Sequence, residues 1–216
     1  MALTRYMLRT GVALALFAVA GTAIVSYTHD QTRARIAQSE RATLLQKLHA
    51  LLPPGQQDND LLGDTLDITA PELGPKMVKV HRARKDGIPV AAVFTPVIAP
   101  DGYSGPIKLL IAIRYDGTLA GVRVIGHRET PGLGDPIEEA RSSWILKFTG
   151  RSLSDPRPDQ WKVKKDGGAF DQFTGATITP RAVVKAVYNS LNYFAAHRDE
   201  LFAPITAPAT AAAPAQ

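Results

Sequence analysis

The spacing of apolar residues predicts a long N-terminal helix in two parts. Thr10–Thr28 contains no charged residue, and its centre, Val12–Ala20, is strongly apolar. A membrane-spanning helix needs roughly 20 such residues, so this stretch is long enough for one crossing. Apolar residues then recur at mostly helical spacing from Gln31 to Leu52, and Pro53-Pro54-Gly55 is expected to end the helix.

From Met77 onward the pattern becomes that of β-strands. Val78–Arg84 with Val90–Ile98, and Ile107–Tyr115 with Thr118–Ile125, are predicted as two hairpins. Asp-Gly pairs punctuate the region at positions 86–87, 101–102, 116–117 and 166–167. Because both residues tolerate positive φ, an Asp-Gly pair between apolar runs is a strong hairpin signal. The sheet is therefore expected to be antiparallel.

A shorter helix is predicted after the glycine-rich loop His127–Asp135. Asp135 is expected to cap it, with Pro136 at the first helical position and Glu138 completing a capping box. Its apolar face is formed by Ile137, Ala140, Trp144 and Phe148. A short strand is predicted at Trp161–Lys165.

The last helix is predicted to start at Thr179 as N-cap and Pro180 as first helical residue. Val184, Val187, Leu191 and Phe194 then recur on one helical face. The whole pattern predicts an α+β protein: a transmembrane helix followed by one domain of antiparallel hairpins and packed helices. The expected segments are an anchor at 1–29, a helical linker with the start of the soluble region at 30–75, the domain at 76–202, and a disordered Ala/Pro-rich tail at 203–216.

The N-terminal apolar stretch has a second interpretation, a cleaved signal peptide, because Ala18-Val19-Ala20 fits the small-residue cleavage pattern. Cleavage there would leave a short apolar core, with Gly21–Val25 beyond it. An uncleaved anchor is therefore favoured. Arginines flank both ends of the span, so the positive-inside rule barely decides its orientation.

Composition excludes several kinds of chemistry. The 216 residues include no cysteine, which rules out protein-ligated iron–sulfur clusters, disulfides and a thiol nucleophile. The net charge of +5 is modest, and the basic run Lys79–Lys85 reads as the solvated face of a strand, so no nucleic-acid partner is expected. The five histidines show no metal-ligand spacing, and no nucleophile elbow or phosphate loop occurs. Neither a metal site nor a catalytic residue is predicted, and any redox chemistry must come from a cofactor.

Candidate chemistry centres on Asp171–Thr179, which by its residue types is a turn leading into a helix start. Thr177 lies just outside the predicted helix, close to backbone N–H groups that have no intrahelical partner and favour an anion. Gly175 and Ala176 keep the approach to its hydroxyl free of bulk. On turn chemistry alone, an ordinary N-cap turn is the favoured interpretation.

The order of residues in Asp-x-x-Thr-Gly-Ala-Thr, however, resembles the flavinylation motif of the FMN-binding domain family. The longer stretch Gly167–Val184 resembles the G subunit of the Rnf-type electron transport complex. The resemblance implies that a flavin transferase moves FMN from FAD onto Thr177, leaving a phosphodiester. Thr174 and Thr179 carry the competing hydroxyls; we assign Thr174 to hydrogen bonding and Thr179 to capping, and Asp171 to recognition by the transferase.

A second stretch, Glu129–Gly134, is also similar to this family; by itself it could be only a strand-to-helix connection. In the family this loop lies beside the flavin. The resemblance implies that Gly132 and Gly134 let backbone N–H groups approach the ring, that Leu133 lies against its face, and that Thr130 or Glu129 binds its polar rim. A third similar stretch, Gly102–Ile107, is expected to be a tight turn entering a strand.

The resemblance implies a membrane-bound electron carrier with covalent FMN in an ion-translocating ferredoxin/NAD oxidoreductase. The chain would act as one subunit of this translocase, with no turnover alone, in the bacterial inner membrane with its domain on the periplasmic side. Its partners would be the other subunits, the flavin transferase and membrane lipid. Two alternatives remain: the C subunit of a sodium-pumping NADH:quinone reductase, whose chain is typically longer, and a cofactor-free membrane-anchored scaffolding domain.

Overall fold

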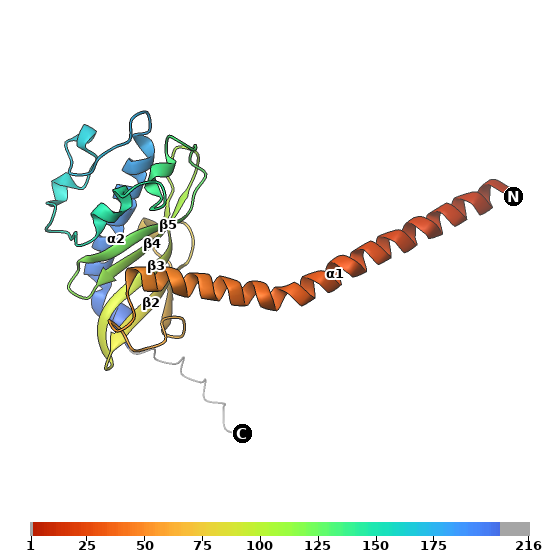
Figure 1. Ribbon diagram of the computed structural model, residues 1–216, viewed down its shortest axis with the longest axis horizontal. Helices are drawn as coiled ribbons and strands as arrows, with labels where there is room; N and C mark the ends of the chain where they lie inside the picture. Colours follow the sequence, from red (N-terminus) through yellow and green to blue (C-terminus); the bar gives the residue numbers. More distant parts are fainter. Residues whose placement is uncertain (1, 204–216) are drawn as a thin grey trace, which may run out of the picture. The chain divides into compact units, whose positions relative to one another are not determined.

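The structure, a computed structural model, describes residues 2–203 (Figure 1). The predicted tail, 203–216, lies outside the described residues except for Ala203. The chain divides into two compact units between Lys47 and Leu48. Helix α1, Ala2–Leu51, begins in the first unit, and its last turn belongs to the second. The predicted continuation of the helix up to the Pro-Pro-Gly stop is confirmed.

Helix α1 carries the predicted span. Its most apolar window has a mean hydropathy of 1.9 and contains no buried residue. Among the described residues α1 is the one helix long and apolar enough to cross a membrane. Phe17, near the middle of the span, is 79% exposed. A helix that is apolar all round and exposed in this way is typical of a membrane span.

The second unit is built on one antiparallel sheet with the strand order β1-β2-β3-β4-β5. The strands are Thr65–Ile68, Val78–Lys85, Ile88–Ala99, Ile107–Arg114 and Leu119–Gly126. Both predicted hairpins, β2–β3 and β4–β5, are confirmed. Asp86 and Gly87 form the tight turn of the first, with φ angles of 51° and 77°. Two positive φ angles are what a two-residue hairpin turn requires.

The sheet starts earlier in the chain than the sequence predicted. Strand β1 lies in the stretch between Gly55 and Pro75, for which no element was predicted, and it pairs with β2 from Thr65 opposite His81 to Ile68 opposite Val78. The compact unit itself begins at Leu48. The polar residues between the short apolar pairs of this stretch hid the strand from a periodicity argument.

Both faces of the central strands are buried, which explains their nearly continuous apolar runs. On one face Phe94 meets Phe194 of helix α2, Ile178–Phe202, edge to face with ring centroids 6.4 Å apart. On the other face Val93, Leu110 and Ala112 are buried together with Leu48, Leu51 and Leu61. Strands buried on both sides lose the alternation of polar and apolar residues that marks a half-exposed strand.

The helix predicted after Asp135 is wrong. Two short 3-10 helices, Asp135–Ile137 and Trp144–Phe148, replace it, and Ala140 is exposed. The reason is that the capping residues bind elsewhere. Asp135 accepts a 2.7 Å hydrogen bond from the Gly132 N–H, and Glu138 binds His127.

The strand predicted at Trp161–Lys165 is also wrong. Val163 forms one isolated bridge with Phe170, and a 3-10 turn, Lys164–Asp166, follows it. The Asp166-Gly167 pair ends this turn and does not connect two strands, so it is not a hairpin.

Candidate functional site

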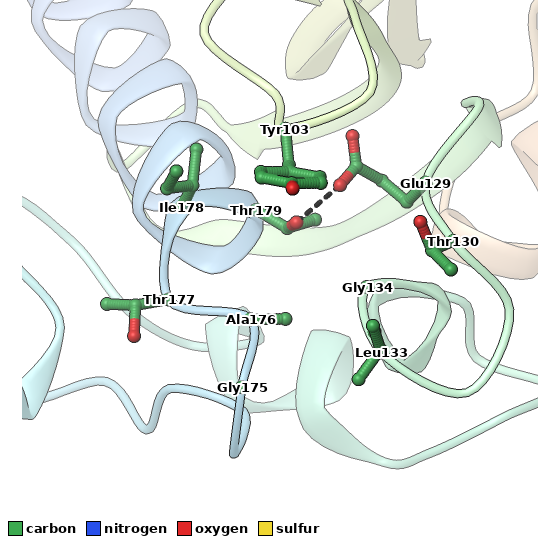
Figure 2. Close-up of a pocket in the computed structure, with 10 residues that line it drawn as sticks. All are labelled: Tyr103, Glu129, Thr130, Leu133, Gly134, Gly175, Ala176, Thr177, Ile178 and Thr179. Carbon is green, nitrogen blue, oxygen red and sulfur yellow. Dashed lines mark hydrogen bonds between the residues drawn. The ribbon is translucent and has the colours of Figure 1, made fainter.

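Three segments that are distant in sequence meet around one hollow of about 140 Å³ (Figure 2). The turn after β3 contributes Tyr103, the loop after β5 contributes Glu129–Thr130 and Leu133–Gly134, and the segment entering α2 contributes Gly175–Thr179. All three stretches were singled out by the sequence, and the fold brings them together.

Glu129 joins the three segments from inside. Its side chain is buried, with 4% of the residue exposed. One carboxylate oxygen, Oε2, accepts a hydrogen bond of 2.5 Å from the Thr179 hydroxyl, and the other, Oε1, accepts one of 3.0 Å from the Ser104 N–H. Figure 2 shows the first of these bonds crossing from the loop to the start of α2. Both oxygens are thus engaged by the protein.

The segments pack around Glu129 so closely that two glycines are required. A Cβ atom at Gly134 would lie 2.8 Å from the Glu129 Cβ and 3.0 Å from the Thr179 Oγ1. A Cβ at Gly102 would lie 2.9 Å from the Glu129 Oε1 and 2.2 Å from the Gly105 carbonyl oxygen. Approaches under 3.0 Å force a neighbour to move, so the glycines serve here to let the segments touch.

The loop after β5 holds its own backbone. The N–H groups of Leu133 and Gly134 both donate to the Thr130 carbonyl at 3.1 Å, and the Gly132 N–H donates to Asp135. His127 accepts from the Glu129 N–H at 3.0 Å through Nδ1, and its Nε2 therefore carries the proton that Glu138 accepts. The N–H groups of Gly132 and Gly134, which were expected to approach the ring, thus each donate within the loop. The side chain of Leu133 lines the hollow.

The three threonines of the motif have different surroundings. Thr179 is fully buried and bonded to Glu129, so its predicted role as N-cap is wrong. Helix α2 begins two residues earlier than predicted, with Thr177 at the N-cap position. Pro180 is still in the first turn of the helix, where backbone N–H groups have no partner within the helix. Thr177 makes no side-chain capping bond and is half-buried beside the hollow. Its hydroxyl points away from the Glu129–Thr179 pair (Figure 2).

Thr174 and Asp171 do not line the hollow. Thr174 is exposed in the turn closed by the 3.1 Å bond from the Ala176 N–H to the Phe173 carbonyl, where Gly175 has a φ of +79°. Asp171 forms ion pairs with Lys147 and Lys164, and hydrogen bonds from these two lysines, that of Lys147 first, hold the pKa of its carboxyl below the ordinary value.

The rim of the hollow is apolar and exposed. Tyr103, Leu133 and Ile178 are 69%, 46% and 43% exposed. Sequence reasoning did not name Tyr103, Ile178 or Thr179 as residues of the site, although each lies in a family-like stretch: Tyr103 in the third, and Ile178 and Thr179 in the first. Ligand pockets combine such apolar walls with a few polar groups. Among the described residues no group of His, Asp or Glu is arranged to hold a metal ion.

Two protein-family models match this chain. A family model of the FMN-binding domain matches residues 102–192, a range that contains all three segments of the hollow, and a model of the RnfG N-terminal region matches residues 1–51.

Two relatives are similar to this chain over most of their length. A protein of Pseudomonas aeruginosa (strain UCBPP-PA14), named as the G subunit of an ion-translocating oxidoreductase complex, is 48% identical over 204 residues, covering 93% of this chain and 94% of its own length. A protein of the same name from Vibrio atlanticus (strain LGP32) is 45% identical over 196 residues, covering 90% of this chain and 93% of its own.

Proposed function

The chain belongs to the G-subunit family of ion-translocating oxidoreductase complexes, and we propose that it carries FMN covalently, through a phosphoester bond to Thr177. Its FMN-binding domain and N-terminal apolar helix make it a membrane electron-carrier subunit of such a complex. FMN supplies the electron-transfer chemistry, since its ring can accept two electrons and release them singly.

The main support for this proposal is that the side chain of Thr177 lines the hollow and makes no capping bond. Of the three motif threonines, Thr179 is excluded as acceptor because it is buried and its hydroxyl is bonded to Glu129. Thr177 lines the hollow, is half-buried and does not cap its helix. A phosphodiester there would stand at the N-terminus of a 25-residue helix, where unpaired N–H groups favour an anion.

Attachment balances as a transfer from FAD. The Thr177 Oγ forms a bond to the phosphorus of the FMN half, the bond within the diphosphate breaks, and AMP leaves while the hydroxyl proton goes to solvent or to a base of the transferase. The flavin transferase is thus the maturation partner. Asp171, held by Lys147 and Lys164, fixes the far end of the acceptor segment for that encounter.

The residues present fit a flavin. At about 140 Å³ the hollow is smaller than the 300–1,000 Å³ of typical small-molecule pockets, so it supports partial enclosure of the ring. The part of the flavin ring outside the hollow would contact the exposed apolar side chains of Tyr103, Leu133 and Ile178. Partial exposure suits an electron carrier, because its donor and acceptor must come close to the ring.

The proposal also covers location and electron path. We place the domain on the periplasmic side of the inner membrane. We propose that the complex passes electrons between ferredoxin and NAD. A tether is useful outside the cytoplasm, where a lost cofactor could not be replaced. The G-subunit relatives, together with the match of residues 1–51, favour this assignment over the C subunit of a quinone reductase.

The test is the mass and fluorescence of the full-length protein produced together with a flavin transferase. The expected mass is that of the chain plus FMN less one water, with a band that fluoresces after denaturing electrophoresis. Thr177→Ala should insert and fold but give no fluorescence, whereas Thr174→Ala, the matched control in the exposed turn, should remain fluorescent. Flavin mapped to Thr174 or Thr179 would overturn the assignment.

A further inference from the structure

We infer that the Glu129 carboxylate lowers the reduction potential of the flavin in this domain, in addition to joining the three segments of the site. The inference rests on the proposed function, since it takes the ligand of the hollow to be FMN. It gives Glu129 an electrostatic role, separate from any direct hydrogen bond to the ring.

The first observation is that the charge of Glu129 is isolated. Among the ten residues that line the hollow, it is the one with an ionisable carboxyl or amine. Lys185, on helix α2, lies 2.8 Å from Asp101 and is paired there. Arg128, the residue before Glu129, is exposed and forms no ion pair with Glu129 in the described part of the chain. Within the described residues Glu129 has two hydrogen-bond donors and no ion-pair partner.

The second observation is that the surroundings support the charged form. The Ser104 N–H can only donate, and it does so to Oε1, while the Thr179 hydroxyl donates to Oε2. Hydrogen bonds to a carboxylate stabilise its ionised state. These two bonds offset part of the cost of burying the charge without neutralising it.

The negative charge of Glu129 would affect the reduction potential of a bound flavin ring. Two electrons and one proton leave the reduced ring with one negative charge more than the oxidised ring. Glu129 borders the hollow and is 4% exposed, so solvent screens its charge poorly. The carboxylate therefore destabilises the reduced state relative to the oxidised state, and the reduction potential falls.

The structure offers variants that separate the charge from the packing. Gln has the shape of Glu, so Glu129→Gln retains an acceptor for the Ser104 N–H and a partner for the Thr179 hydroxyl while it removes the charge. Glu129→Met removes the charge without the amide. Glu138→Gln is the matched control, because that carboxylate binds His127 on the same loop but does not line the hollow.

The experiment is a spectroelectrochemical redox titration of the full-length protein in detergent, after mass measurement has established that flavin is attached. We expect both neutral variants of Glu129 to shift the midpoint potential upward, and Glu138→Gln to leave it at the wild-type value. Thr179→Val, which keeps the charge, should lower the melting temperature without raising the potential.

A wild-type potential in flavin-loaded Glu129→Gln would overturn the inference. Failure of both neutral variants to fold would overturn it as well, because the charge would then serve the fold. Wild-type protein without attached flavin would instead contradict the proposed function, so the two failures are distinguishable.

Discussion

Thr179 Oγ1 lies 2.5 Å from Oε2 of Glu129, a residue 50 positions earlier in the chain. The bond fixes the start of α2 against the loop that follows β5, and so sets the position of Thr177, two residues before Thr179. The position of Thr177, the proposed attachment site, therefore depends on a buried pair of residues.

Removing this bond should destabilise the domain. Thr179→Val leaves Glu129 Oε2 buried without a donor, which costs about 1–3 kcal/mol of unfolding free energy. Thr179→Ser keeps the hydroxyl and should lose less than half as much. Urea unfolding of the detergent-solubilised chain measures both. Equal stability of the Val and Ser variants would contradict the role given to the hydroxyl.

The two glycines of the loop should respond differently to alanine. Gly134→Ala places a Cβ against Glu129 and Thr179, so flavin fluorescence and absorption should change together with stability. Gly132 has a φ of +79° and open space around its Cβ position. Gly132→Ala should therefore cost about 1–2 kcal/mol through backbone strain alone.

Absorption spectra of the two flavin-loaded variants test this, with unfolding curves measured in parallel. Attachment to Thr177 should survive in both, because the transferase reads the other segment. Identical spectra for wild type and Gly134→Ala would leave the loop with a structural role only.

The domain should lose stability in mild acid because of His81. This residue is 2% exposed; its Nδ1 lies 2.7 Å from the Leu61 carbonyl oxygen, and its Nε2 has no partner among the described residues. Burial first of all, and Lys79 in addition, lower its pKa below 6.5. The unfolded chain then binds a proton first, so the stability contributed by neutral His81 is lost as the pH falls from about 6.5 towards the folded pKa.

Unfolding curves measured at about pH 7.5 and about pH 5.5 bracket the ordinary histidine pKa. His81→Gln, which can still donate to the Leu61 carbonyl, should show a smaller loss of stability between them than wild type. His197→Gln is the control, because the His197 side chain is 38% exposed and pairs with Glu200. An unchanged pH dependence in His81→Gln would rule out His81 as the source.

An ion cluster at the end of α2 should matter far more than a surface pair. Asp64 accepts hydrogen bonds from Arg82 at 2.6 Å and Arg84 at 2.9 Å, and these arginines donate onward to the carbonyls of Ala203 and Phe202. Cations at this position also suit the helix C-terminus. Asp64→Asn leaves the buried Arg82 uncompensated and should cost about 3 kcal/mol.

The control for Asp64→Asn lies three residues further along the chain, on β1. The pair of Lys79 with Asp67 has side chains 45% and 43% exposed, and Asp67→Asn should cost less than about 1 kcal/mol. Chemical unfolding of both variants decides. Similar costs for the two substitutions would mean that burial does not set the strength of the cluster.

The topology of the anchor is open to a direct test. The uncharged run Thr10–Thr28 should be retained, with residues from about Asp30 onward outside the cytoplasm. Protease added to intact spheroplasts should digest the domain. Protection of the domain, or a mature N-terminus at Gly21, would contradict this topology.

Much of the architecture could be predicted from local sequence. The helix up to Leu51, the two hairpins and the buried face Val184–Phe194 follow from periodicity and turn residues, because a helix or hairpin is stabilised by neighbours within a few positions. The sequence also singled out the three stretches that form the hollow, from their family-like residue order and not from any physical argument that would bring them together.

Tertiary structure alone decided what the polar side chains of these stretches bind. Asp135, Glu138 and Thr179 all have the chemistry of helix caps, and each binds a different partner: the Gly132 N–H, His127 and Glu129. A side-chain oxygen accepts or donates wherever burial leaves a group without water, and the partner across the fold is invisible to sequence spacing. The bond that engages the Thr179 hydroxyl is therefore made with a residue 50 positions earlier in the chain.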